Sequence, residues 1–168
     1  MNRFPKTFII FDTEFTAWKG SNKRNWSKKN EYKELVQIGA LKIEKINKNS
    51  KQKLKIVDKL SIFIKPKINP ILSEYFIELT GITQKYIENK GVSLSKALSL
   101  FYKFSKDDKG NNIPLYSYGN DYEIISINLK LNNTPQNSKF YKWKRYFCNL
   151  TPIFSKYINI KKYSSGNV

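Results

Sequence analysis

The chain has 168 residues, 40% of them apolar, which suits one domain with a sizeable hydrophobic core. Its one cysteine, Cys148, excludes an internal disulfide, and the lack of histidine excludes imidazole zinc sites, Ser-His-Asp triads and a histidine general base. The formal net charge of +18 favours polyanionic partners, above all nucleic acid, although lysine with asparagine is also what an AT-rich coding sequence produces without selection.

The N-terminal residues lack the long apolar stretch of a signal peptide, and no apolar run reaches the length of a membrane span. One cysteine agrees with a reducing compartment. We therefore expect a cytoplasmic protein with no membrane partner, whose oligomeric state the sequence does not fix.

Short apolar segments that alternate with polar ones predict a mixed sheet with helices on its faces. The first strand leads into a lysine- and asparagine-rich loop over 16–33, and a turn-like stretch at 47–51 predicts an antiparallel hairpin. The expected strands are 7–13, 34–43, 54–65, 113–118 and 146–150. The expected helices are 71–78, a short one capped by Thr83, an amphipathic one from Ser93, 121–131, and one that begins at Thr151-Pro152.

Asp12 and Glu14 follow four large apolar residues, Phe8 to Phe11, which read as a strand buried on both faces. The two carboxylates share one side of the strand and repel each other unless a cation lies between them; oxygen ligands favour Mg²⁺ or Mn²⁺ over zinc. For an isolated Asp-x-Glu, an ordinary strand end is the better explanation. Asp121, however, follows a second strand, and the carboxyl ends of parallel strands share one edge, so we expect three carboxylates to converge.

Four segments carry a more specific pattern. They are Phe11-Asp12-Thr13-Glu14-Phe15-Thr16, Glu34-Leu35-Val36-Gln37-Ile38-Gly39-Ala40, Lys65-Pro66 followed by Leu79-Thr80-Gly81-Ile82-Thr83, and Tyr118-Gly119-Asn120-Asp121. In this order they resemble the motifs of the DEDD (DnaQ-like) 3′–5′ exonuclease family, closest to its ERI-1-like and KapD-like branch. The resemblance implies an α/β, ribonuclease H-like fold with a mixed five-stranded sheet flanked by helices.

The resemblance also implies a reaction: hydrolysis of terminal phosphodiester bonds at the 3′ ends of single-stranded RNA or DNA, with two divalent cations, Mg²⁺ or Mn²⁺. In that reaction Asp12 would contact both ions, Glu14 would hold the first and Asp121 the second. Phe15 and Thr16 would meet the terminal nucleotide.

Further nucleic-acid contacts are expected at two places. Leu79, Thr80 and Ile82 would flank the base or sugar, although core packing and a helix-ending hydrogen bond explain them equally well. The loop after the metal motif combines aromatic and basic side chains, which suits stacking on unpaired bases; packing of its tryptophans onto the body is the slightly better alternative. These loop candidates are Trp18, Arg24 and Trp26.

The family's third motif, a general-base histidine or tyrosine followed by a fourth carboxylate, has no counterpart. There is no histidine, and no acidic residue follows Tyr163. Asp107 and Asp108 are expected at the opposite end of the sheet, and Glu123 is expected to point away from Asp121.

We therefore expect residues 1–168 to form a single exonuclease-like domain that is incomplete at its C-terminus, lacks the closing helix, and is impaired as an enzyme. Loss of a general base costs about 10²–10⁴-fold in rate. The alternative is a non-catalytic, basic nucleic-acid-binding module.

Overall fold

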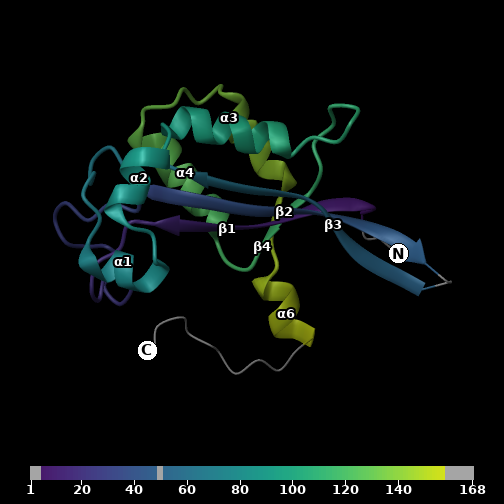
Figure 1. The fold of residues 1–168 in the computed structure, drawn as a ribbon, viewed down its shortest axis with the longest axis horizontal. Helices are drawn as coiled ribbons and strands as arrows, with labels where there is room; N and C mark the ends of the chain where they lie inside the picture. Colours follow the sequence, from purple (N-terminus) through teal and green to yellow (C-terminus); the bar gives the residue numbers. More distant parts are fainter. Residues whose placement is uncertain (1–4, 49–50, 158–168) are drawn as a thin grey trace.

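The structure, a computed structural model, describes residues 5–48 and 51–157. Its strands are β1 (Thr7–Phe15), β2 (Leu35–Lys48), β3 (Lys51–Phe63), β4 (Leu115–Ser117) and β5 (Phe147–Asn149). They form one sheet in the order β3-β2-β1-β4-β5 (Figure 1). β1 is antiparallel to β2 and parallel to β4, which confirms the predicted mixed five-stranded sheet.

Helices cover the sheet unevenly. The helical elements are α1 (Glu74–Thr80), α2 (Gln84–Lys90), α3 (Leu94–Phe104), α4 (Asp121–Leu131), α5 (Lys139–Lys142), the 3₁₀ helix η1 (Trp143–Tyr146) and α6 (Thr151–Tyr157). α3 and α4 lie on one face of the sheet and α6 lies on the other (Figure 1). Ser73, Thr83 and Ser93 cap α1, α2 and α3 by accepting a hydrogen bond from a backbone N–H three residues on, as N-cap side chains do.

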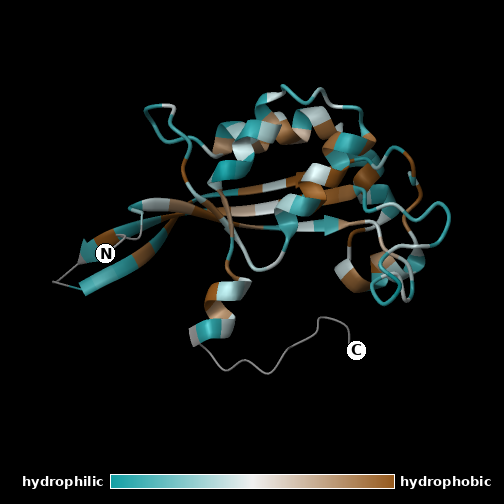
Figure 2. Cartoon of the chain, turned by 180° about the vertical axis from the view of Figure 1, so that it is seen from behind, coloured by the Kyte–Doolittle hydropathy of each residue, from teal (hydrophilic) through white to brown (hydrophobic). Residues whose placement is uncertain are grey.

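The hydrophobic core has two parts. The larger lies between the sheet and α3 and α4, where Ile9, Phe11 and Phe101 are almost fully buried. The smaller joins Val36 of β2 to α1 and α2. Figure 2 shows the hydrophobic residues gathered where helices face strands, as burial of apolar surface requires.

β1 differs from the prediction on one face. Ile9 and Phe11 are buried, but Ile10 is 40% exposed and Asp12 also reaches solvent. Phe8, on the same face as Ile10, is 3% exposed, so the expected burial on both faces holds at Phe8 and fails at Ile10. On the face that carries Ile10, α6 packs beside β4, where the rings of Phe154 and Tyr118 are 6.0 Å apart.

Two other features were not predicted. α5 and η1 are too short to show helical periodicity, yet they place Trp143, 1% exposed, against Phe101. The β2–β3 hairpin is longer than expected, with pairing from Gln37↔Phe63 to Lys48↔Lys51, and its outer end projects beyond the body (Figure 1). Within residues 5–48 and 51–157, no helix is both long and apolar enough to cross a bilayer.

Candidate active site at the carboxyl ends of β1 and β4

Asp121 is fixed against β1 by Thr13. The backbone N–H and the hydroxyl of Thr13 both donate to Oδ1 of Asp121, over 3.0 and 2.7 Å. The Asp121 side chain begins α4 just after β4 and is 7% exposed. Charge-assisted hydrogen bonds of this kind hold a buried carboxylate in one orientation. They occupy Oδ1, so Oδ2 is the oxygen left for a further partner.

Asp12 and Glu14 emerge from β1 beside Asp121. Although Asp12 reaches solvent, desolvation by the surrounding chain raises its pKa, and repulsion from Asp121 raises it further. The pKa of Glu14 is raised by desolvation first, and then by Asp12 and Asp121. The structure thus brings the three carboxylates close enough to repel one another, at the edge where β1 and β4 end.

The chemistry of these donors fits a divalent cation. All are carboxylate oxygens, which hard ions such as Mg²⁺ and Mn²⁺ prefer, and a cation would relieve the repulsion that raises the pKa of Asp12 and of Glu14. In the described part of the chain, no three acidic, histidine or cysteine side chains form a ready-made ligand shell. Asp12, Glu14 and Asp121 therefore fit an ion by donor type and charge rather than as a completed shell.

A cavity of about 500 Å³ opens beside Asp12 and Asp121, and Glu14 is not among its lining residues. Asp12 and Phe15 of β1 line it, together with Asp121 and Glu123 from the first turn of α4. Glu123 was expected to point away from Asp121; both residues line the cavity, but Asp121 is buried whereas Glu123 is exposed, as residues two apart on a helix are when they face different sides. The remaining lining residues are Thr13, Asn25, Lys33, Tyr118, Gly119, Asn120 and Ile124.

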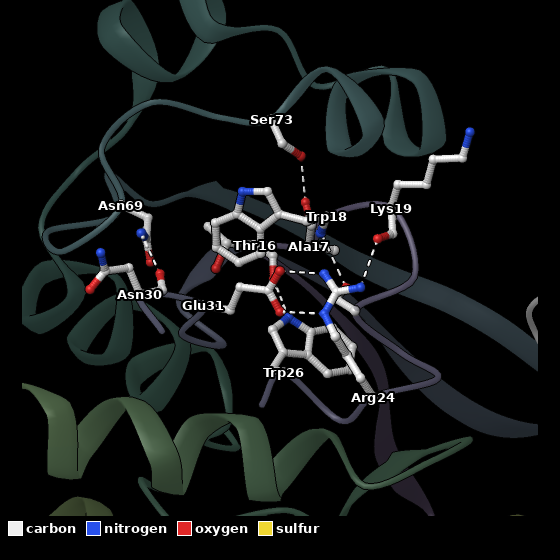
Figure 3. Close-up of polar contacts among 11 residues, drawn as sticks. Thr16, Ala17, Trp18, Lys19, Arg24, Trp26, Asn30, Glu31, Asn69 and Ser73 are labelled. Carbon is white, nitrogen blue, oxygen red and sulfur yellow. Dashed lines mark hydrogen bonds and ion pairs between the residues drawn. The ribbon is translucent and has the colours of Figure 1, made fainter. Parts of the chain in front are cut away.

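Trp26 joins the loop after β1 to the body. Its Nε1–H donates to the carbonyl oxygen of Thr16 over 2.9 Å (Figure 3). The Trp26 ring lies 5.4 Å from that of Phe15. Its backbone has φ = +54°, in the left-handed region that bulky residues rarely adopt. These contacts place the Trp26 ring in packing between loop and strand.

Arg24 is bonded to other residues of the same loop. Its guanidinium forms a two-point ion pair with Glu31, with Nε donating to Oε2 over 2.9 Å, and Nη1 donates to the carbonyl oxygen of Lys19 over 2.8 Å (Figure 3). The hydrogen bond from Arg24 is the main cause that lowers the pKa of Glu31. Trp18, half-buried, donates its backbone N–H to Ser21 Oγ over 3.1 Å.

Of the other residues predicted to contact the nucleotide, Thr80, Thr16 and Ile82 have structural roles, and Leu79 is exposed. Thr80 has the helix-ending role: its hydroxyl donates to the carbonyl oxygen of Phe76 over 2.8 Å and accepts from the Ile82 N–H over 3.1 Å. Ile82 itself is buried, whereas Leu79 is 64% exposed. Thr16 is also engaged, since its hydroxyl accepts from the Glu34 N–H over 3.0 Å.

Two buried polar residues were not singled out from the sequence. The carboxylate of Glu34, 3% exposed, accepts hydrogen bonds from three successive backbone N–H groups over 67–69. The Asn128 side chain accepts from the Leu35 N–H over 2.9 Å and donates to the carbonyl oxygens of Lys33 and Ile124. The local sequence around Glu34 and Asn128 could not predict these bonds, because most of the partners lie more than 30 residues away in the chain. Tyr163 lies outside the described residues.

Comparisons with known proteins agree with this geometry. The family model described as exonuclease (RNase_T) matches residues 9–162. The PolC-type DNA polymerase III of Lactococcus lactis subsp. lactis (strain IL1403) is 27% identical over 135 residues, which are 80% of this chain and 7% of that polymerase. The chain therefore spans a small part of the length of this relative.

Many solved structures are similar in fold, and two nucleases are among them. The nuclease domain of 3′hExo, described as a DEDDh family member bound to rAMP, has a TM-score of 0.72 at 17% identity, over 95% of this chain and 74% of that one. Cell-death related nuclease 4 (CRN-4) has a TM-score of 0.68 at 18% identity, over 96% of this chain and 52% of that one. The predicted ribonuclease H-like exonuclease fold is confirmed, and with the family match over most of its length, the chain belongs to the RNase_T, DnaQ-like 3′–5′ exonuclease family.

Proposed function

We propose that this chain removes nucleotides from the 3′ ends of single-stranded nucleic acid by hydrolysis that depends on two divalent cations, Mg²⁺ or Mn²⁺. The observation that carries the proposal is the group of three mutually repelling carboxylates, Asp12, Glu14 and Asp121, two of which, Asp12 and Asp121, line a cavity of about 500 Å³. Mutual repulsion costs stability, so its retention at one edge of the sheet is typical of a functional site.

In the proposed site, Asp12 and Glu14 would hold one cation, and Asp12 and Asp121 would hold the other. Bound cations in such a site lower the pKa of water and offset negative charge on a leaving oxygen. Thr13 orients Asp121 through its two hydrogen bonds to Oδ1, and neither of them occupies Oδ2. Phe15 lines the cavity and offers an apolar wall for the terminal nucleotide.

The absence of histidine from the 168 residues limits the proposed rate. Without an imidazole, no histidine side chain can accept the proton of the attacking water. The expected loss in the rate of hydrolysis is about 10²–10⁴-fold. A non-catalytic, basic nucleic-acid-binding module is therefore the second candidate, supported by the same absence and by the net charge of +18.

The motifs Phe11–Thr16 and Tyr118–Asp121 support placing the chain near the ERI-1-like and KapD-like branch. One similar solved structure is described as recognising a histone mRNA stem-loop at its 3′ end, which favours RNA over DNA as the proposed substrate. A cytoplasmic location remains a proposal.

The experiment is to incubate the 168-residue protein with a 5′-labelled single-stranded oligonucleotide and Mn²⁺. A ladder shortened from the 3′ end, absent with Asp12→Ala, is the expected result. RNA and DNA strands of the same sequence are run in parallel to identify the substrate. Binding of the strand without shortening would leave the binding module as the function.

A further inference from the structure

One lysine, Lys33, lines the cavity beside Asp12 and Asp121. Among the described residues around it, Lys33 is the positively charged one, facing a lining that includes Asp12, Asp121 and Glu123. Within residues 5–48 and 51–157, no ion pair within 4.0 Å joins Lys33 to these carboxylates. Lys33 therefore adds a positive charge to a lining that is otherwise acidic or neutral, and no carboxylate of that lining pairs with it.

The loop holds the Lys33 ammonium group in place. Nζ donates to Asn25 Oδ1 over 2.9 Å and lies 4.5 Å from the centre of the Trp26 ring, in cation–π geometry. Asn25 and Trp26 are consecutive residues with left-handed backbones, φ = +50° and +54°. Such backbone strain persists where surrounding contacts enforce it, and here it sets the two partners of one lysine side by side.

The backbone of Lys33 is fixed as well. Its carbonyl oxygen accepts a hydrogen bond of 2.7 Å from Asn128 Nδ2, and Asn128 is a buried residue of α4. Lys33 is thus held at both ends, between the loop and the helix that supplies Asp121. A lysine fixed in this way loses less side-chain entropy when it binds an anion than a mobile surface lysine does.

We propose that Lys33 binds a backbone phosphate of the strand whose 3′ end lies in the cavity. This inference rests on the proposed function. An ammonium group has three donors, and Asn25 uses one, so two remain for phosphate oxygens. The binding counters the repulsion that Asp12, Asp121 and Glu123 exert on an incoming polyanion.

The experiment removes one charge from the protein and one from the oligonucleotide, singly and together, as in a double-mutant cycle. Lys33→Met removes the charge and keeps a long chain to pack on Trp26; Lys33→Gln is the second variant if the first folds poorly. Lys29→Met, an exposed lysine of the same loop outside the cavity lining, is the matched control. Binding of a short fluorescent single-stranded oligonucleotide is measured with Ca²⁺, over a range of salt concentrations. Urea unfolding checks the fold of each variant.

Lys33→Met should reduce the salt slope of log K by about 0.7 and weaken binding about fivefold at 0.1 M salt, as loss of one phosphate contact predicts. A methylphosphonate placed at single positions near the 3′ end should weaken binding of the unmodified protein at one position, yet have no further effect on Lys33→Met. Lys29→Met should respond to that position as the unmodified protein does.

Equal effects of every methylphosphonate on the unmodified protein and Lys33→Met would overturn the assignment. The result is independent of hydrolysis: coupling without strand shortening would refute the exonuclease proposal and keep the phosphate site, and shortening without coupling would do the reverse.

Discussion

Thr13 and Asp121, 108 residues apart in the chain, share a single carboxylate oxygen: the N–H and the hydroxyl of Thr13 both donate to Oδ1. This contact ties the first strand to the start of α4. It makes the position of one proposed metal ligand depend on a neutral residue that binds no metal.

Thr13→Val should therefore lower both stability and metal affinity. The substitution keeps the shape and the backbone donor but removes the 2.7 Å hydroxyl bond to a buried carboxylate, which costs about 1.5–3 kcal/mol. Urea unfolding and Mn²⁺ titration measure the two effects. Thr13→Ser, which retains the hydroxyl, is the control; equal behaviour of the two variants would show that this bond contributes nothing.

Asp12→Asn should stabilise the metal-free protein. The folded-state pKa of Asp12 and that of Glu14 are raised, so their ionised forms penalise folding at neutral pH, and the penalty disappears as pH falls through the raised values. The gain should be below about 1 kcal/mol, because Asp12 is screened by solvent. This gain in the free energy of unfolding should be complete at neutral pH and should disappear in acid.

With divalent ions present, the unmodified protein should instead be more stable than Asp12→Asn. Mn²⁺ at 100 times its dissociation constant would stabilise the unmodified protein by about 2.7 kcal/mol and Asp12→Asn by much less. Chemical unfolding with EDTA and with Mn²⁺ makes both comparisons. If Asp12→Asn is the less stable protein in EDTA, the three carboxylates do not repel as described.

Trp26 offers a test of backbone strain. Trp26→Ala should cost on the order of 2 kcal/mol, since the half-buried ring and its bond to Thr16 are lost. Glycine usually destabilises more than alanine, but it adopts φ = +54° freely, so Trp26→Gly should be at least as stable as Trp26→Ala. Thermal unfolding of the pair decides it; a markedly less stable glycine variant would mean that position 26 is not held left-handed.

Glu34→Gln should loosen the connection between β3 and α1. The buried carboxylate accepts from three backbone N–H groups, and an amide can offer one oxygen, so a loss of about 3 kcal/mol is expected. Glu78→Gln, at an exposed position of α1, serves as the control. Urea unfolding of both variants tests this, and a Glu34→Gln midpoint equal to that of the control would refute it.

The sheet and the meeting of Asp12 with Asp121 could be predicted because strand ends are local features and parallel neighbours share an edge. The partners of Glu34, Asn128 and Lys33 could not, since each depends on contacts between distant segments. Ile10 reads as buried because apolar runs do not reveal which face a helix covers.

The projecting β2–β3 hairpin implies a gradient of local stability along its length. Pairs such as Gly39↔Ser61 lie in the sheet beside β1, whereas Lys45↔Leu54 and Lys48↔Lys51 lie toward the outer end, where Leu54 is 64% exposed. Amide hydrogens near the outer end should therefore exchange with deuterium through fraying that leaves the edge with Asp12 and Asp121 intact, and those near Gly39 only when the whole domain opens.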